Sequence, residues 1–258
     1  MAHGWSEVTS SPAAARSEGP TTPAWLWPNL LSLDAPAFAV TWQWMLARTL
    51  HAKLPPAVPL ALALCVWAVY VLDRVLDGAS AMTPRHLFAA RYRKQLLVAV
   101  VAGLILGGVT LLPRLPYLII LRGFAMAAAC GIYLLVVRTR SEYPKGAAMS
   151  LLCAAGIVLP FWNWPAFVMT VLTVWGNTRM IDAWEAGQRP GSALRLLLFC
   201  ISLVSAVRLS RFGTGAALGC GLMLVVDAAG VWMSRNAVRC LLDWALIVGA
   251  LAGIGLAF

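Results

Sequence analysis

Nine apolar segments follow one another along this chain, separated by short loops rich in proline, glycine and arginine. About 20 helical residues cross the hydrocarbon core of a bilayer, and lipid forces every backbone polar group to be satisfied within a helix or a closed barrel. These segments do not alternate polar and apolar residues as barrel strands do. The pattern therefore predicts an all-α, polytopic membrane helix bundle of about nine transmembrane helices. The expected segments are 33–50, 57–75, 94–112, 115–137, 146–163, 164–182, 191–207, 213–234 and 238–258. Because 146–163 and 164–182 are nearly continuous, a count of eight stays open.

Composition supports a membrane protein. Of the 258 residues, 61% are hydrophobic and only 12% are charged, whereas soluble domains carry roughly 25% charged residues. The 20 basic residues outnumber the 10 acidic ones, but they are scattered through short loops. That placement fits positive charge retained on the cytoplasmic face and argues against a nucleic-acid partner.

The basic residues also predict orientation. They are more frequent in the loops that follow the second, fourth, sixth and eighth segments, which places those loops and the amino terminus in the cytoplasm. Residues 1–24 are rich in Ser, Pro, Ala, Thr and Gly and are expected to form a disordered tail. Residues 25–258 are expected to form a single transmembrane domain, in a bacterial inner (plasma) membrane.

Common catalytic and metal motifs are missing from the sequence. The six cysteines lie singly, without a Cys-x-x-Cys pair, and this spacing indicates small core residues. The sequence contains no Gly-x-Ser-x-Gly, P-loop or His-Glu-x-x-His pattern, so hydrolase, nucleotide-binding and zinc-protease functions lose their main support.

A first acidic cluster ends the second apolar segment. Asp73 and Asp77 are four residues apart, so they share a helix face with Tyr70 one turn earlier. Two carboxylates this close repel each other near lipid unless a cation lies between them. Magnesium suits this role because it takes oxygen ligands and bridges carboxylates to substrate phosphates. The alternative is an interfacial pair that only forms salt bridges with Arg85 or Arg93.

A second acidic cluster ends the sixth segment. Asp182 and Glu185 are three residues apart and share a face, with Asn177 close by and Arg179 beside them. The alternative is a helix end whose acids pair with neighbouring arginines. If the two clusters face one cytoplasmic cavity, they predict a site for a diphosphate held through magnesium, with cations that stabilise the departing anion.

These residues resemble the UbiA superfamily of intramembrane aromatic prenyltransferases. Its members have about nine helices, an Asn-Asp-x-x-x-Asp-x-x-x-Asp type motif after helix two and an Asp-x-x-Asp type motif followed by glycine after helix six. Asp73-x-x-x-Asp77 is similar to the end of the first motif, and Asp182-x-x-Glu185-x-Gly187 resembles the second. The chain departs from the family at Val69 and Tyr70, where the first motif begins with Asn and Asp, and at Glu185, where the second has Asp.

The resemblance implies transfer of an isoprenoid group from a prenyl diphosphate to a lipophilic or aromatic acceptor. Magnesium would be held by Asp73, Asp77, Asp182 and Glu185. The diphosphate would be bound by Arg85, Lys145, Arg179, Asn177 and Tyr70. The alternative is a non-catalytic or transporter-like membrane protein whose buried acids carry ions or fix helix packing.

Two further acids lie inside apolar segments. Asp227 falls in the middle of the eighth segment, where a carboxylate at lipid depth indicates either function or a hydrogen bond to Ser or Asn on a neighbouring helix. Asp243 is expected near a helix start, where the helix dipole favours a carboxylate, so a structural role is predicted for it.

Overall fold

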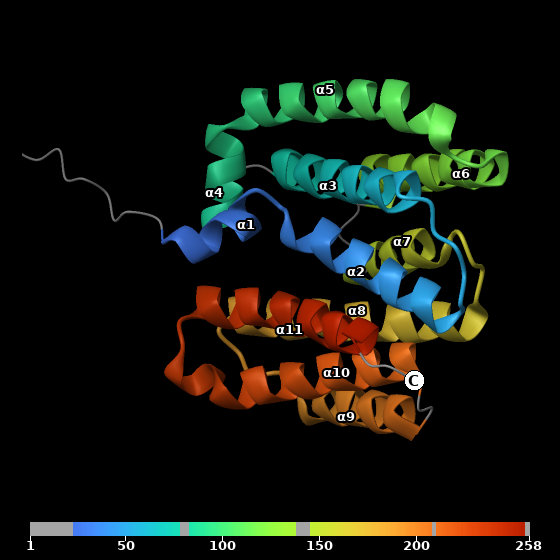
Figure 1. Ribbon diagram of the computed structural model, residues 1–258. Helices are drawn as coiled ribbons and strands as arrows, with labels where there is room; N and C mark the ends of the chain where they lie inside the picture. Colours follow the sequence, from blue (N-terminus) through green and yellow to red (C-terminus); the bar gives the residue numbers. More distant parts are fainter. Residues whose placement is uncertain (1–22, 78–82, 138–144, 208–209, 256–258) are drawn as a thin grey trace, which may run out of the picture.

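The computed structural model describes residues 23–77, 83–137, 145–207 and 210–255, and every regular element in these ranges is helical (Figure 1). The expected tail, residues 1–24, lies outside the described residues except for its last two positions. Ala24 already begins a short 3₁₀ turn, η1 (Ala24–Leu26). The all-α prediction is confirmed for the described residues.

The long helices coincide with the nine predicted segments. They are α2 (Asp34–Thr49), α3 (Ala57–Asp77), α5 (Arg93–Leu111), α6 (Tyr117–Ile132), α7 (Lys145–Val158), α8 (Trp164–Glu185), α9 (Ser192–Val207), α10 (Arg211–Ala229) and α11 (Arg235–Gly255). Short turns extend three of them: η3 (Leu112–Arg114), the π-turn η4 (Tyr133–Val137) and η5 (Gly230–Trp232). Two short helices, α1 (Trp27–Leu30) and α4 (Pro84–Arg91), were not expected, because neither lies in a long apolar run.

Within the residues that the structure describes, five helical segments are long and apolar enough to cross a membrane. They are Ala57–Asp77, Arg93–Arg114, Tyr117–Val136, Arg211–Trp232 and Arg235–Gly255. Helices α7 and α9 are apolar but shorter. These lengths and compositions indicate an integral, multi-pass membrane protein. The full count of nine spans stays a prediction.

The helices of the carboxyl-terminal half pack tightly against each other. Glycines let α10 and α11 approach closely, because a Cβ atom added at Gly249 would lie 2.6 Å from the backbone oxygen of Gly215. Trp42 of α2 is fully buried beside this pair and donates from Nε1 to the backbone oxygen of Leu246 at 3.1 Å. Close approach through small residues is the usual way in which helices pack in lipid.

Helices α5 and α6 lie at the periphery. In Figure 1, α5 covers the side of α3 that faces away from the carboxyl-terminal helices. Most of their large apolar side chains are exposed, including Ile105 on α5 and Phe124 on α6. An exposed apolar surface of this kind fits contact with lipid.

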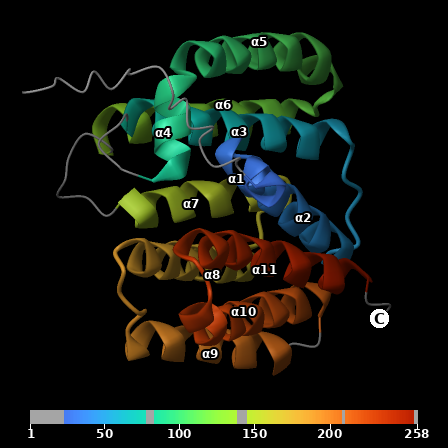
Figure 2. The same cartoon turned by 90° about the vertical axis from the view of Figure 1, so that its left-hand side faces the viewer.

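Successive long helices run in opposite directions (Figures 1 and 2). At one end of the bundle, the carboxyl ends of some helices therefore lie beside the amino ends of others. The ends of α3 and α8, which carry the two acidic clusters, and the starts of α2, α7 and α11 lie at this end, and α1 and α4 lie close to it. The topology therefore brings together segments that are far apart in the sequence.

Candidate functional site

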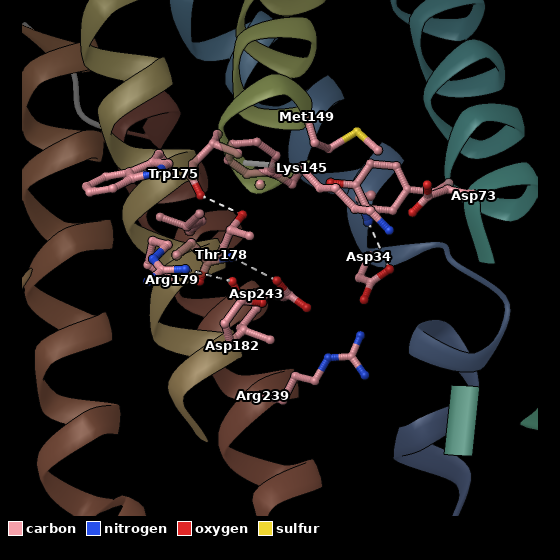
Figure 3. Close-up of a pocket in the computed structure, with 18 of the residues that line it drawn as sticks. Asp34, Asp73, Lys145, Met149, Trp175, Thr178, Arg179, Asp182, Arg239 and Asp243 are labelled. Carbon is pink, nitrogen blue, oxygen red and sulfur yellow. Dashed lines mark hydrogen bonds and ion pairs between the residues drawn. The ribbon is translucent and has the colours of Figure 1, made fainter. Parts of the chain in front are cut away.

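A cavity of about 700 Å³ opens at this end of the bundle, and we call it the polar cavity. Side chains from α2, α3, α4, α7, α8 and α11 and from the turn η4 line it (Figure 3). Its polar lining comprises Asp34, Tyr70, Asp73, Arg74, Arg85, Tyr133, Lys145, Asn177, Thr178, Arg179, Asp182, Arg239 and Asp243. Carboxylates and cations are therefore mixed in one space, as a site for a charged ligand requires.

Of the four predicted metal ligands, Asp73 and Asp182 line the polar cavity. Tyr133 donates from its hydroxyl to Asp73 Oδ1 at 3.2 Å. Asp182 Oδ2 lies 3.6 Å from the guanidinium of Arg179, one turn earlier on α8, and both side chains are largely exposed. The predicted meeting of the two acidic clusters thus holds for one residue from each.

Asp77 and Glu185 lie beside the polar cavity and are not part of its lining. Asp77 is 3.9 Å from Lys145 Nζ and 3.9 Å from His86 Nε2. Glu185 lies between two arginines, with its Oε1 atom 3.0 Å from Arg85 Nη2 and 3.2 Å from Arg239 Nε. Glu185 therefore pairs with arginines, which was the alternative interpretation of its cluster, although they come from α4 and α11 and not from the flanks of α8.

These positions do not form a magnesium cage. Among the residues that the structure describes, no three or more His, Cys, Asp or Glu side chains are grouped closely enough to hold a metal ion. Two guanidinium groups at Glu185 also repel a divalent cation there. Magnesium can be held by one or two carboxylates together with substrate phosphates, so its binding stays a prediction, with Asp73 and Asp182 as the carboxylates that line the cavity.

All five predicted diphosphate-binding residues line the polar cavity: Tyr70, Arg85, Lys145, Asn177 and Arg179. Asn177 donates from Nδ2 to Asp243 Oδ1 at 2.9 Å, and its own Oδ1 is buried without a hydrogen-bond partner. The side chain of Arg85 is 20% exposed. Its burial, together with the nearby Arg239, lowers the pKa of Arg85 to about 10, although Glu185 opposes the shift. Lys145 begins α7 and is well exposed.

Four charged residues of the polar cavity were not assigned to the site from the sequence: Asp34, Arg74, Arg239 and Asp243. Asp34 begins α2 and accepts a hydrogen bond from the amide of Asn29, whose backbone oxygen accepts from Arg74. The predicted helix-start role of Asp243 is wrong, because α11 begins at Arg235 and Asp243 lies two turns further on. Arg239 and Asp243 both come from α11, whereas Asp34 comes from α2 and Arg74 from α3. Spacing within one helix could therefore not bring all four together.

Asp227 does not belong to the polar cavity. It is buried on α10 and accepts hydrogen bonds from Arg195 Nε at 2.7 Å and Trp184 Nε1 at 3.0 Å. Both donors come from neighbouring helices, as the structural alternative expected, but they are an arginine and a tryptophan and not the expected Ser or Asn. Asp227 therefore ties α10 to α8 and α9.

A second space, the apolar pocket, has a volume of about 450 Å³ and adjoins the same helices. Its walls are almost entirely aliphatic and come mainly from α3, α5, α6 and α7. Consecutive residues divide between the two spaces. Asp73 lines the polar cavity and Leu72 the apolar pocket, and likewise Tyr133 lines the first and Leu134 the second.

Comparison with known proteins gives no further assignment. The chain matches no protein-family model, no curated protein and no solved structure. Membership of the UbiA superfamily stays a prediction from the acidic motifs, and what the protein does is inferred from its own cavity and pocket.

Proposed function

We propose that this protein binds an isoprenoid diphosphate and transfers its prenyl group to a lipophilic or aromatic acceptor. The observation that carries the proposal is the adjacency of the polar cavity and the apolar pocket. Leu72 and Asp73 are consecutive on α3 and line different spaces, and a ligand that is charged at one end and aliphatic at the other would suit such a pair of spaces. A prenyl diphosphate has this construction.

The head group has cationic partners in the polar cavity. Arg85, Lys145 and Arg179 come from three different helices and line the cavity together. Arginine binds phosphate oxygens through paired N–H donors, and lysine acts as a compact charge. Such contacts stabilise negative charge that develops on a departing diphosphate.

The transfer begins when the bond between the diphosphate oxygen and the first prenyl carbon breaks. The electron pair leaves with the diphosphate, and an allylic cation remains. The aromatic rings of Tyr70 and Trp175 line the cavity and can face this cation. An electron-rich acceptor then forms the new bond to carbon and releases a proton.

The proposal extends to the membrane setting. In it, all nine long helices lie in a bacterial inner membrane in a UbiA-like arrangement, with the polar cavity and the amino terminus at the cytoplasmic face. The basic loops after the even-numbered segments support this orientation. Magnesium held by the acidic residues stays a prediction.

Binding and turnover test the proposal directly. Purified protein in detergent is incubated with farnesyl diphosphate, with and without magnesium, and both its melting temperature and the release of diphosphate are measured. The expected result is a rise in melting temperature that the Lys145→Gln variant reduces and that a matched exposed change outside the cavity, Arg114→Gln, leaves unchanged. If farnesyl diphosphate produces no shift under any condition, the enzymatic proposal is wrong and the transporter-like alternative gains support.

A further inference from the structure

Arg239 is a buried guanidinium whose hydrogen-bonding capacity is unused. It projects from α11 into the polar cavity (Figure 3) and is only 5% exposed. An arginine carries five N–H donors, yet among the described residues Arg239 has only an ion pair, from Nε to Glu185 Oε1 at 3.2 Å, and that nitrogen has no hydrogen bond. A buried charged donor left without acceptors is costly. The arrangement therefore calls for a ligand rich in oxygen.

Arg85, on the same side of the polar cavity, also has an N–H donor without a partner. Its Nη2 atom reaches Glu185, whereas its Nε atom is buried without a hydrogen-bond partner. Arg239 is close enough to Arg85 that its charge helps to lower the pKa of Arg85. Glu185 supplies one negative charge for two positive ones, so this corner keeps an excess of positive charge and of free donors.

The neighbouring acids add negative charge to the cavity, but they supply no hydrogen-bond acceptor to Arg239 within the described residues. Asp243 accepts a hydrogen bond from Asn177, and Asp34 accepts one from Asn29, so both carboxylates already have donors of their own. Neither has a hydrogen bond to Arg239 within the part of the chain that the structure describes. An anion between Arg239 and Arg85 would supply the acceptors that both lack.

We propose that Arg239 and Arg85 bind the oxygens of the diphosphate directly, in a subsite that needs no magnesium. The inference rests on the proposed function and specifies how that site holds its head group. Guanidinium groups suit this role because they bind phosphate with two parallel N–H bonds. Glu185 is then a counter-ion that occupies the subsite until the anion arrives, and it is not a metal ligand.

The subsite and a magnesium cage assign different roles to Glu185, and the two roles predict opposite effects of one substitution. If Glu185 binds magnesium, Glu185→Gln weakens the binding of inorganic pyrophosphate. If Glu185 is the counter-ion of Arg85 and Arg239, the same change frees two guanidinium groups and binding becomes equal or tighter. The amide keeps the size of the side chain, so the two outcomes report on charge.

The experiment measures the affinity of the full-length protein in detergent for inorganic pyrophosphate, by thermal shift and by calorimetric titration. One arm contains EDTA, one contains magnesium, and potassium chloride keeps the ionic strength equal. The native protein is expected to bind in EDTA, and Arg239→Gln is expected to weaken this binding by roughly tenfold or more, since a hydrogen bond to a charged group is worth about 1.5–3 kcal/mol. The matched control is Arg235→Gln, which removes a charge from the exposed start of the same helix, outside the cavity lining.

The outcomes are distinguishable. Binding that appears only with magnesium, or native-like binding by Arg239→Gln in EDTA, overturns the inference and leaves the proposed function standing. Loss of binding by Glu185→Gln also overturns it. No binding in either arm overturns the inference and the proposed function together. If Arg239→Gln does not fold, the pyrophosphate affinities of the native protein in EDTA and of the Glu185→Gln variant still test the inference.

Discussion

Glu185 at the end of α8 and Arg85 at the start of α4 are one hundred residues apart in the chain, and their side chains lie 3.0 Å apart. The contact joins the second acidic motif to the segment that follows the first, so it ties together the two halves of the bundle at the polar cavity. Arg239 completes the group from a third element, α11, at 3.2 Å.

Neutralising Glu185 is therefore expected to destabilise the fold. Glu185→Gln leaves Arg239, which is buried, and Arg85 without their shared carboxylate. The expected loss is about 1–3 kcal/mol in the free energy of unfolding, because Arg85 and Glu185 are themselves partly exposed. The measurement is unfolding in a denaturing detergent. Asp182→Asn on the same helix is the control, since its ion pair with Arg179 is solvent-exposed and is worth about 0–1 kcal/mol. Equal losses in the two variants would contradict this role of Glu185.

The close approach of α10 and α11 depends on Gly249. Its added Cβ would lie 2.6 Å from Gly215 O and 2.6 Å from Gly219 N, and backbone atoms cannot move aside as a flexible side chain can. Gly249→Ala is expected to destabilise the protein by about 1–3 kcal/mol. Gly255→Ala on the same helix is the matched control, because an added Cβ there has no neighbour within 4 Å. A neutral Gly249→Ala would show that the helices do not pack this closely.

Filling the apolar pocket is expected to weaken binding of the prenyl tail and leave binding of the head group intact. Gly123 lines this pocket, and a Cβ atom there meets nothing within 4 Å, so Gly123→Leu places its side chain in open space. Each displaced methylene of the ligand is worth about 0.8 kcal/mol, so affinity for farnesyl diphosphate should fall by roughly tenfold or more. Affinity for inorganic pyrophosphate should not change, and Gly255→Leu should change neither. A parallel loss of pyrophosphate binding would indicate distortion of the fold in place of a blocked pocket.

Most of the helices could be predicted from the sequence, because apolar length and loop punctuation are local properties. The start of α8 is an example: Pro165 lies in its first turn and Asn163 caps it by accepting from Ala166 N at 2.9 Å. The short helix α4 was missed because its residues are mixed in polarity, and it is placed by contacts with other elements.

The site was predictable only in part, for the same reason. Asp73 and Asp182 were found because each ends an apolar segment, and alternating helix directions bring such ends together. The partners of Glu185 were not found, since pairing between α8, α4 and α11 depends on how the helices pack in three dimensions. Arg239 gave no signal because it follows an ordinary loop at the start of an apolar segment, where a basic residue is expected in any membrane protein.

His86 is expected to make stability depend on pH. It lies on α4, where burial and the neighbouring Arg85 lower its pKa to about 4, with Asp77 and Glu185 opposing and Arg74 adding to the shift. Its ordinary pKa is 6.5, and above that value the imidazole is neutral in the folded and unfolded chains alike, so it contributes no pH dependence. As the pH falls from 6.5 toward 4, the unfolded chain takes up a proton that the folded protein excludes, and the folded state loses stability.

Between about pH 7.5 and about pH 5, the native protein should therefore lose about 1–2 kcal/mol more than His86→Gln, in which this group cannot titrate. The difference between the two proteins is the measured quantity, because every ionisable group other than His86 is present in both. Unfolding of each protein in a denaturing detergent at the two pH values supplies the data. Parallel pH profiles for the native protein and the variant would mean that the imidazole is accessible to protons in the fold, and that α4 does not shield it at the edge of the polar cavity.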